Sequence, residues 1–135
     1  MRLIFLTFAM LLGAGLAFAE TFESSAGPLT VTRMLGDLDQ PWAIGFLPDG
    51  SYLVTQRDGI LSYVQDGSEQ IISGVPDVVA EGQGGLLDVM IPRDFDTSRE
   101  VFLSYSKILS GGLGTALAVG TFNQNARKLT DVRVL

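Results

Sequence analysis

Asp-Gly pairs recur at a regular spacing in this chain and limit its fold more than any other sequence feature. Asp49-Gly50, Asp58-Gly59 and Asp66-Gly67 follow one another every eight or nine residues. Each pair lies between short runs in which apolar and polar residues alternate, a pattern that predicts strands. Glycine accepts a positive φ and Asp can hydrogen-bond its own backbone, so Asp-Gly favours tight hairpins. Three such turns predict a four-stranded antiparallel meander rather than three unrelated surface loops.

The strand pattern then repeats. The segment Trp42–Asp49 resembles Leu86–Asp94, because each is an apolar strand that ends at a proline with an acidic residue just after it. The two segments start 44 residues apart, and four strands fit in each interval. This period is typical of a β-propeller, in which each blade is a four-stranded sheet. The expected strands cover 42–47, 51–56, 60–65 and 69–73 in the first blade and 86–91, 101–106, 115–123 and 129–135 in the second.

The fold class is therefore all-β, with about two four-stranded blades and a leading strand over 29–35. In a closed propeller such a leading strand can complete the last blade. Propellers need more blades than two, since each blade buries its faces only against its neighbours. The pattern is still that of a strand at Leu135, so we expect residues 20–135 to be the first two blades of a truncated propeller.

Residues 1–19 have the pattern of a signal peptide. Arg2 is followed by an apolar run from Leu3 to Phe18, and the small residues Ala17 and Ala19 suit a cleavage site before Glu20. The run is shorter than the roughly 20 apolar residues that span a bilayer, and glycines interrupt it. We expect a secreted or periplasmic protein with no stable membrane span.

The composition excludes several kinds of site. The chain has no Cys and no His, so it has neither a disulfide nor a Cys/His nucleophile pair, and it lacks the commonest general base. Its formal net charge of −6, without a basic stripe, argues against nucleic acid as a partner. The pairs Asp37/Asp39 and Asp94/Asp96 lack the series of ligands that calcium loops have and are interpreted as turn-forming acids.

The connection between the two predicted blades holds the strongest candidate for a site. It reads Gly82-Gln83-Gly84-Gly85 just before an expected innermost strand. Glycines let the backbone approach a ligand closely, and the amide of Gln83 offers a donor and an acceptor. The alternative is a flexible loop with a solvated glutamine. Trp42 is interpreted as a core residue between blades, and Arg57 and Tyr63 as residues that support the fold.

With these elements placed, the sequence resembles a known family. The segments 38–44, 46–50, 53–57, 82–89 and 101–105 are similar to the opening of the soluble quinoprotein sugar dehydrogenases. These are the aldose, or glucose/sorbosone, dehydrogenases that use pyrroloquinoline quinone (PQQ). The resemblance covers nearly all of the chain after the signal peptide.

The resemblance implies a six-bladed propeller with PQQ over the central channel and a bound calcium that activates it. It implies oxidation of the C1 hydroxyl of an aldose sugar to a lactone, with hydride transfer to PQQ; the electron acceptor stays open. Gln83 matches a glutamine of the family that contacts cofactor or substrate. The family also often has a histidine where Ile91 stands, which we interpret as variation at a strand end.

The catalytic histidine of the family and its calcium ligands would lie beyond Leu135. We therefore expect no catalytic residue and no metal ligand in this chain, and an inactive fragment. A calcium-dependent lactonase-like propeller, or a propeller that only binds, is the alternative, because the fold alone does not choose among them.

Overall fold

The computed structural model describes residues 19–135. The predicted signal peptide, residues 1–19, lies outside this part except for Ala19, which begins the first strand. The chain divides into two compact units, one up to Met34 and one from Leu35 to Leu135, and each is described by itself.

The first unit contains a two-stranded hairpin. Strand β1 (Ala19–Phe22) pairs antiparallel with β2 (Leu29–Thr32), and all side chains of both strands are exposed. The expected strand at 29–35 is therefore present but ends at Thr32. Its partner β1 was not predicted, because four residues with one aromatic side chain give too little alternation to recognise.

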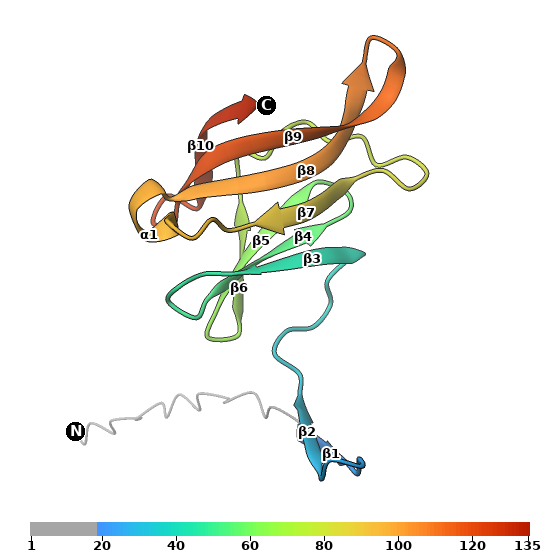
Figure 1. The fold of residues 1–135 in the computed structure, drawn as a ribbon, viewed down its shortest axis with the longest axis vertical. Coiled ribbons are helices and arrows are strands. Elements are labelled where there is room, and N and C mark those ends of the chain that lie inside the picture. The colour runs from blue at the N-terminus through green and yellow to red at the C-terminus, as the bar shows by residue number, and fades with distance from the viewer. Residues whose placement is uncertain (1–18) are drawn as a thin grey trace, which may run out of the picture. The chain divides into compact units, whose positions relative to one another are not determined.

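A meander in the order β3-β4-β5-β6 forms the first sheet of the second unit (Figure 1). Its strands are β3 (Pro41–Phe46), β4 (Tyr52–Gln56), β5 (Ile60–Gln65) and β6 (Ser68–Ile72). The three Asp-Gly pairs connect these strands, as the spacing predicts. Asp66 and Gly67 have φ of 50° and 74° between the paired residues Gln65 and Ser68, the backbone of a type I′ turn.

The second sheet is a meander in the order β7-β8-β9-β10. Its strands are β7 (Leu86–Met90), β8 (Glu100–Leu109), β9 (Gly112–Asn123) and β10 (Lys128–Val134). Strands β8 and β9 are longer than predicted, because their hairpin continues past the core with exposed side chains such as Ile108 and Leu113. A single helical turn, α1 (Phe95–Ser98), follows β7 and is too short to show a helical period in the sequence.

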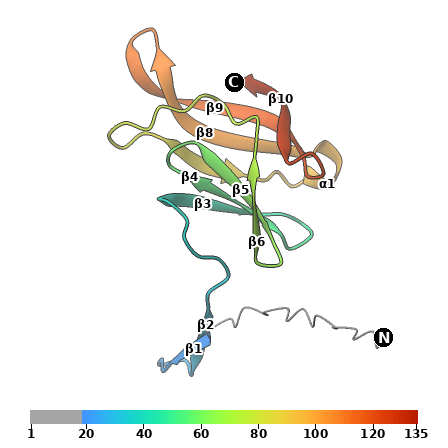
Figure 2. The ribbon, with the colours of Figure 1, turned by 180° about the vertical axis from the view of Figure 1, so that it is seen from behind.

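One hydrophobic core lies between the two sheets. Strand β7 lies against β3 and β4, and Figures 1 and 2 show it in this position from opposite sides. The core joins side chains of both meanders, so the sheets stabilise each other by burying apolar surface. Its largest buried members are Leu53, Leu61, Tyr63, Leu86, Phe95, Leu103, Tyr105, Phe122 and Leu129.

The repeat predicted from the sequence is confirmed, since β3 and β7 each begin a four-stranded meander. The expectation that Trp42 belongs to the core is wrong for this chain, because half of its surface is exposed (50%). Strand β3 turns Gly45 toward the second sheet, where a Cβ would lie 3.1 Å from Ile91 and 3.3 Å from Val89. The alternate side chains Ile44 and Phe46 are exposed with Trp42, because neither sheet covers them.

Candidate functional site

The glycine-rich segment forms a tight turn immediately before β7. The N–H of Gly84 donates to the carbonyl oxygen of Glu81 at 2.7 Å, which closes a four-residue turn with Gln83 at its third position. Gly82, at the second position, has φ of 56°, a conformation that favours glycine. This connection is the yellow segment that leads into β7 in Figure 1. The turn leaves the Gln83 side chain exposed.

Two further glycines bring the segment against the sheets. A Cβ on Gly84 would lie 2.6 Å from Oγ of Ser106, and one on Gly85 would lie 2.5 Å from the carbonyl oxygen of Arg57. Main-chain hydrogen bonds hold the segment in the same position. The N–H of Leu86 donates to Arg57 O at 2.8 Å, and the N–H of Ser106 donates to Gly85 O at 2.8 Å. The segment is thus joined to both sheets and is not a loose loop.

The side chain of Arg57 also contacts this segment, which the sequence interpretation missed. Its guanidinium donates to the carbonyl oxygens of Ala80, Gly82 and Gly84. Arg57 is therefore more than a residue that supports a strand end. The order of the strands could have indicated this contact. Strand β4 runs antiparallel to β3, so Arg57, which follows β4, lies near the beginnings of β3 and β7. Tyr63 is a core residue as expected, and its hydroxyl accepts a hydrogen bond from Gln124.

Gln83 lines a hollow of about 540 Å³ beside this turn. The opposite side of the hollow comes from the ends of β8 and β9, so both strands of the second sheet's long hairpin contribute. The residues that line it are Glu81, Gly82, Gln83, Gly84, Leu87, Ser106, Leu113, Gly114 and Thr115. Gln83 brings an amide, Ser106 and Thr115 bring hydroxyls, and Leu87 and Leu113 bring apolar surface. Such a lining suits a polar organic ligand held by hydrogen bonds.

The charges of the site are few. Glu81 is the only ionisable residue in the lining. Tyr105 precedes Ser106 in β8. Burial, and then the charge of the Asp77 carboxylate, raise the pKa of its phenol, so the phenol is uncharged at neutral pH. Among residues 19–135, no group of three acidic, His or Cys side chains is placed to hold a metal ion. The hollow therefore offers mainly hydrogen-bonding and apolar groups together with a single carboxylate, a lining that suits an organic ligand.

The fold and this site define a class of protein. Two successive four-stranded meanders, whose first strands lie on adjoining inner positions, are two neighbouring blades of a β-propeller. Residues 38–135 match the glucose/sorbosone dehydrogenase family, and the chain belongs to that family.

Relatives and solved structures agree with this assignment. The aldose sugar dehydrogenase YliI of Escherichia coli is 47% identical over 116 residues, which are 82% of this chain and 31% of that protein. An uncharacterised Synechocystis protein, slr1608, is 31% identical over 126 residues, which are 86% of this chain and 30% of that protein. The chain thus spans about a third of the length of these relatives.

Two solved structures extend the comparison. The apo form of the soluble E. coli aldose sugar dehydrogenase is 48% identical with a TM-score of 0.67, over 72% of this chain and 29% of that one. The PQQ-bound aldose sugar dehydrogenase of Streptomyces coelicolor has a TM-score of 0.70 at 19% identity, over 90% of this chain and 35% of that one. The second likeness supports the fold alone.

Within residues 19–135, no helix has the length and apolar character needed to cross a bilayer.

Proposed function

We propose that this chain supplies the first two blades of a six-bladed PQQ-dependent sugar dehydrogenase, which oxidises the C1 hydroxyl of aldose sugars to lactones. PQQ, when bound, accepts the hydride that leaves the sugar carbon. The observation that supports this proposal is the position of Gln83, which lies in the connection between the blades and lines the hollow beside β7.

In this proposal the amide of Gln83 contacts the cofactor or the sugar. Its N–H₂ donates to a carbonyl or hydroxyl oxygen of the ligand, and its oxygen accepts from a hydroxyl. Ser106 and Thr115 offer further hydrogen-bonding groups on the other side of the hollow. This wall can bind and orient a ligand, but it offers no histidine, the commonest general base near neutral pH.

We further propose that residues 1–19 direct export and are removed, which places the protein in the periplasm or outside the cell. N-terminal sequencing of the protein recovered from the cell envelope fraction or the medium tests this, with Glu20 as the expected first residue. Recovery of the protein only from the cytoplasm, beginning at Met1, would contradict the proposal.

Ligand titration tests the role of Gln83. We would add PQQ with calcium, and then glucose, to the ¹⁵N-labelled chain and follow the side-chain amide signals by NMR. The Gln83 signal is expected to shift, and Gln83→Ala is expected to weaken binding by roughly tenfold, or about 1.4 kcal/mol. Gln65→Ala, at an exposed position at the end of β5, is the matched control and should leave binding unchanged. Equal binding by both variants would remove Gln83 from the site.

A dye-linked glucose oxidation assay, with PQQ and calcium added, tests whether this chain alone can catalyse the reaction. The 135-residue chain alone is expected to show no turnover above buffer, because it has no histidine to act as the general base. Turnover by this chain would show that it carries catalytic groups that we have not identified.

A further inference from the structure

The side chain of Arg57 is surrounded by the connection that carries Gln83. Its Nε donates to Gly84 O at 3.1 Å, and its Nη2 donates to Gly82 O at 3.0 Å and to Ala80 O at 3.3 Å. The acceptors are carbonyl oxygens of alternate residues, so the segment curves around one guanidinium. Nη1 donates to Oε1 of Gln40, which precedes the first blade, at 3.2 Å.

The carbonyls of Gly82 and Gly84 flank Gln83 on both sides. The Gly82 carbonyl belongs to the peptide group before Gln83, and the peptide group after Gln83 is held by the hydrogen bond from the N–H of Gly84 to Glu81 O. Holding these two peptide groups limits the rotation of the backbone at Gln83, and hence the direction of its side chain. The chain immediately after is fixed by the same residue, since Arg57 O accepts from the N–H of Leu86 at 2.8 Å. A guanidinium suits this arrangement because it is planar, always charged and carries five N–H donors in a fixed fork.

The glycine at position 85 leaves room for the Arg57 side chain. A Cβ on Gly85 would lie 2.6 Å from Cγ of Arg57, so the arginine stem lies directly against that glycine. Arg57 itself is part-buried, which strengthens its hydrogen bonds to carbonyl groups relative to those of a fully solvated side chain.

We infer that Arg57 is a positioning residue, which holds the turn Glu81–Gly84 in the conformation that presents the Gln83 amide to the hollow. It acts through Gln83 and not on the ligand, since it does not line the hollow. The inference deepens the proposed function and depends on it for the identity of the ligand, whereas the ordering of the turn can be tested without any ligand.

The first test measures the order of the turn in the ligand-free chain. In Arg57→Met, hydrogen exchange of the Gly84 amide is expected to accelerate about tenfold or more, while the core amides of Leu103 and Tyr105 stay protected. Arg57→Lys keeps the charge but not the fork, so it should restore only part of the protection. Unchanged exchange at Gly84 in Arg57→Met would overturn the inference.

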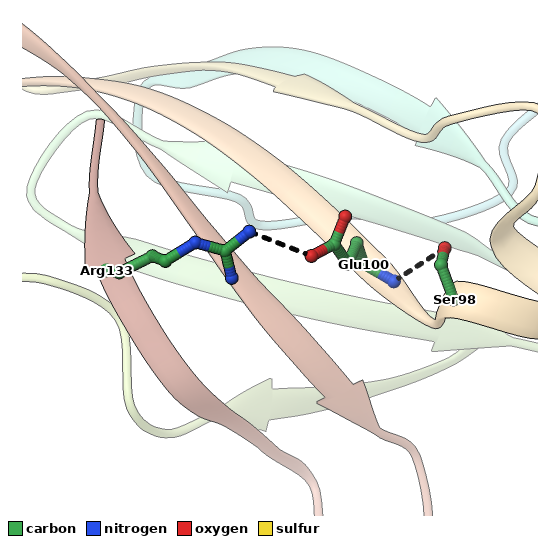
Figure 3. A network of polar contacts seen from close by, with 3 residues as sticks. All are labelled: Ser98, Glu100 and Arg133. Carbon is green, nitrogen blue, oxygen red and sulfur yellow. Dashed lines mark hydrogen bonds and ion pairs between the residues drawn. The ribbon is translucent and has the colours of Figure 1, made fainter.

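Arg133 offers a matched control. It forms an ion pair with Glu100 at 3.1 Å on the second sheet, and Glu100 in turn donates its N–H to Oγ of Ser98 (Figure 3). The Arg133 side chain is 59% exposed, and Arg133→Met removes a guanidinium without changing any contact of the turn Glu81–Gly84. Exchange at Gly84 is expected to stay at the wild-type rate in this variant.

A measurement on the unaltered chain covers the case in which Arg57→Met does not fold. A guanidinium bonded to several fixed carbonyls rotates slowly about its C–N bonds, so Arg57 should give separate, protected Nε–H and Nη–H signals in ¹⁵N NMR. The Arg133 signals should be averaged by rotation and exchange. Averaged signals for Arg57 would contradict the inference.

Titration with PQQ and calcium separates this inference from the proposed function. If both hold, Arg57→Met weakens binding and Arg133→Met does not. If the wild-type chain shows no shift at Gln83 while Arg57→Met still loosens the turn, the ligand assignment fails and the positioning role stands. If Gln83 binds PQQ equally well in Arg57→Met, the positioning role fails and the ligand assignment stands.

Discussion

At the scale of single residues, Gly85 is the position where the site depends most on the absence of a side chain. A Cβ would meet the carbonyl oxygen of Arg57 at 2.5 Å, and main-chain bonds hold both segments. Neither side can move cheaply, so we expect Gly85→Ala to destabilise the chain by about 1–3 kcal/mol. Urea unfolding at one fixed chain concentration measures the effect.

Gly111→Ala is the control for this substitution, because a Cβ there meets nothing within 4 Å. It is expected to change the unfolding midpoint little. Equal midpoints for the two variants would show that the segment before β7 can relax away from Arg57.

The lowered pKa of Asp49 makes part of the folding stability of the chain depend on pH. The Ser51 hydroxyl donates to Oδ1 of Asp49 at 2.5 Å, and this bond, helped by the Ser51 N–H and opposed by desolvation, lowers the pKa of Asp49. A lowered pKa stabilises the folded chain above the ordinary Asp value, and the contribution is lost as pH falls through the folded value. Wild type and Ser51→Ala should therefore differ by a constant amount above about pH 4 and converge below it.

Stability measured from neutral to acidic pH tests this prediction, together with ¹³C NMR titration of the Asp49 carboxyl group. The carboxyl of Ser51→Ala should titrate at a higher pH than that of wild type. Ser110→Ala, at an exposed turn, should leave the titration of Asp49 unchanged. A stability difference that widens on acidification would contradict the assigned cause.

The sequence predicts residues that act through local rules better than residues that act through tertiary contacts. Gln83 was chosen as a candidate because glycines on both sides of a polar side chain form a local pattern, and its role stays a prediction. Arg57 was missed because its partners in the connection before β7 lie more than twenty residues away. The error at Trp42 has a related cause: alternation places it on one face of β3 but does not tell whether another sheet covers that face.

At the scale of elements, turns were predicted more reliably than strand ends. Asp-Gly chemistry fixes the three hairpins of the first sheet, whereas β8 and β9 extend beyond the apolar alternation because hydrogen bonding continues without a core. Polar side chains as well as apolar ones take part in the contact between the two sheets. Thr55 in β4 is fully buried, and its hydroxyl donates to Leu87 O in β7 at 2.5 Å while accepting from the N–H of Ala43 at 3.0 Å.

Thr55→Val should therefore weaken the joint between the two sheets. The substitution keeps the shape of the side chain but leaves the Leu87 carbonyl without its hydroxyl donor, at a cost of about 1–3 kcal/mol. Urea unfolding monitored by circular dichroism measures the loss. Thr30→Val, at an exposed position of β2, is the control and should stay near wild type. A neutral effect of Thr55→Val would show that the hydrogen bond from Thr55 to Leu87 O does not stabilise the contact between the sheets.

At the scale of the whole molecule, the second unit carries several large apolar side chains that are exposed on one face of its first sheet. On the first sheet, the cross-strand register places Ile44 and Ile71 on one face, and both are about half exposed. Trp42 and Phe46 of β3 are exposed as well, Phe46 to 67%. Exposed apolar side chains of this kind favour association, particularly beside an exposed strand edge such as that of β3.

We therefore expect the isolated chain to self-associate as its concentration rises, with Trp42 fluorescence shifting to the blue as its indole leaves water. The double substitution Ile44→Glu with Phe46→Glu should shift the distribution toward monomer, because like charges cannot be buried together without partners. Sedimentation velocity over a wide range of concentration measures the distribution. Phe22→Glu alters a large exposed apolar residue of the first unit and should leave association unchanged. A wild-type chain that stays monomeric at all concentrations would show that these exposed apolar side chains do not drive association.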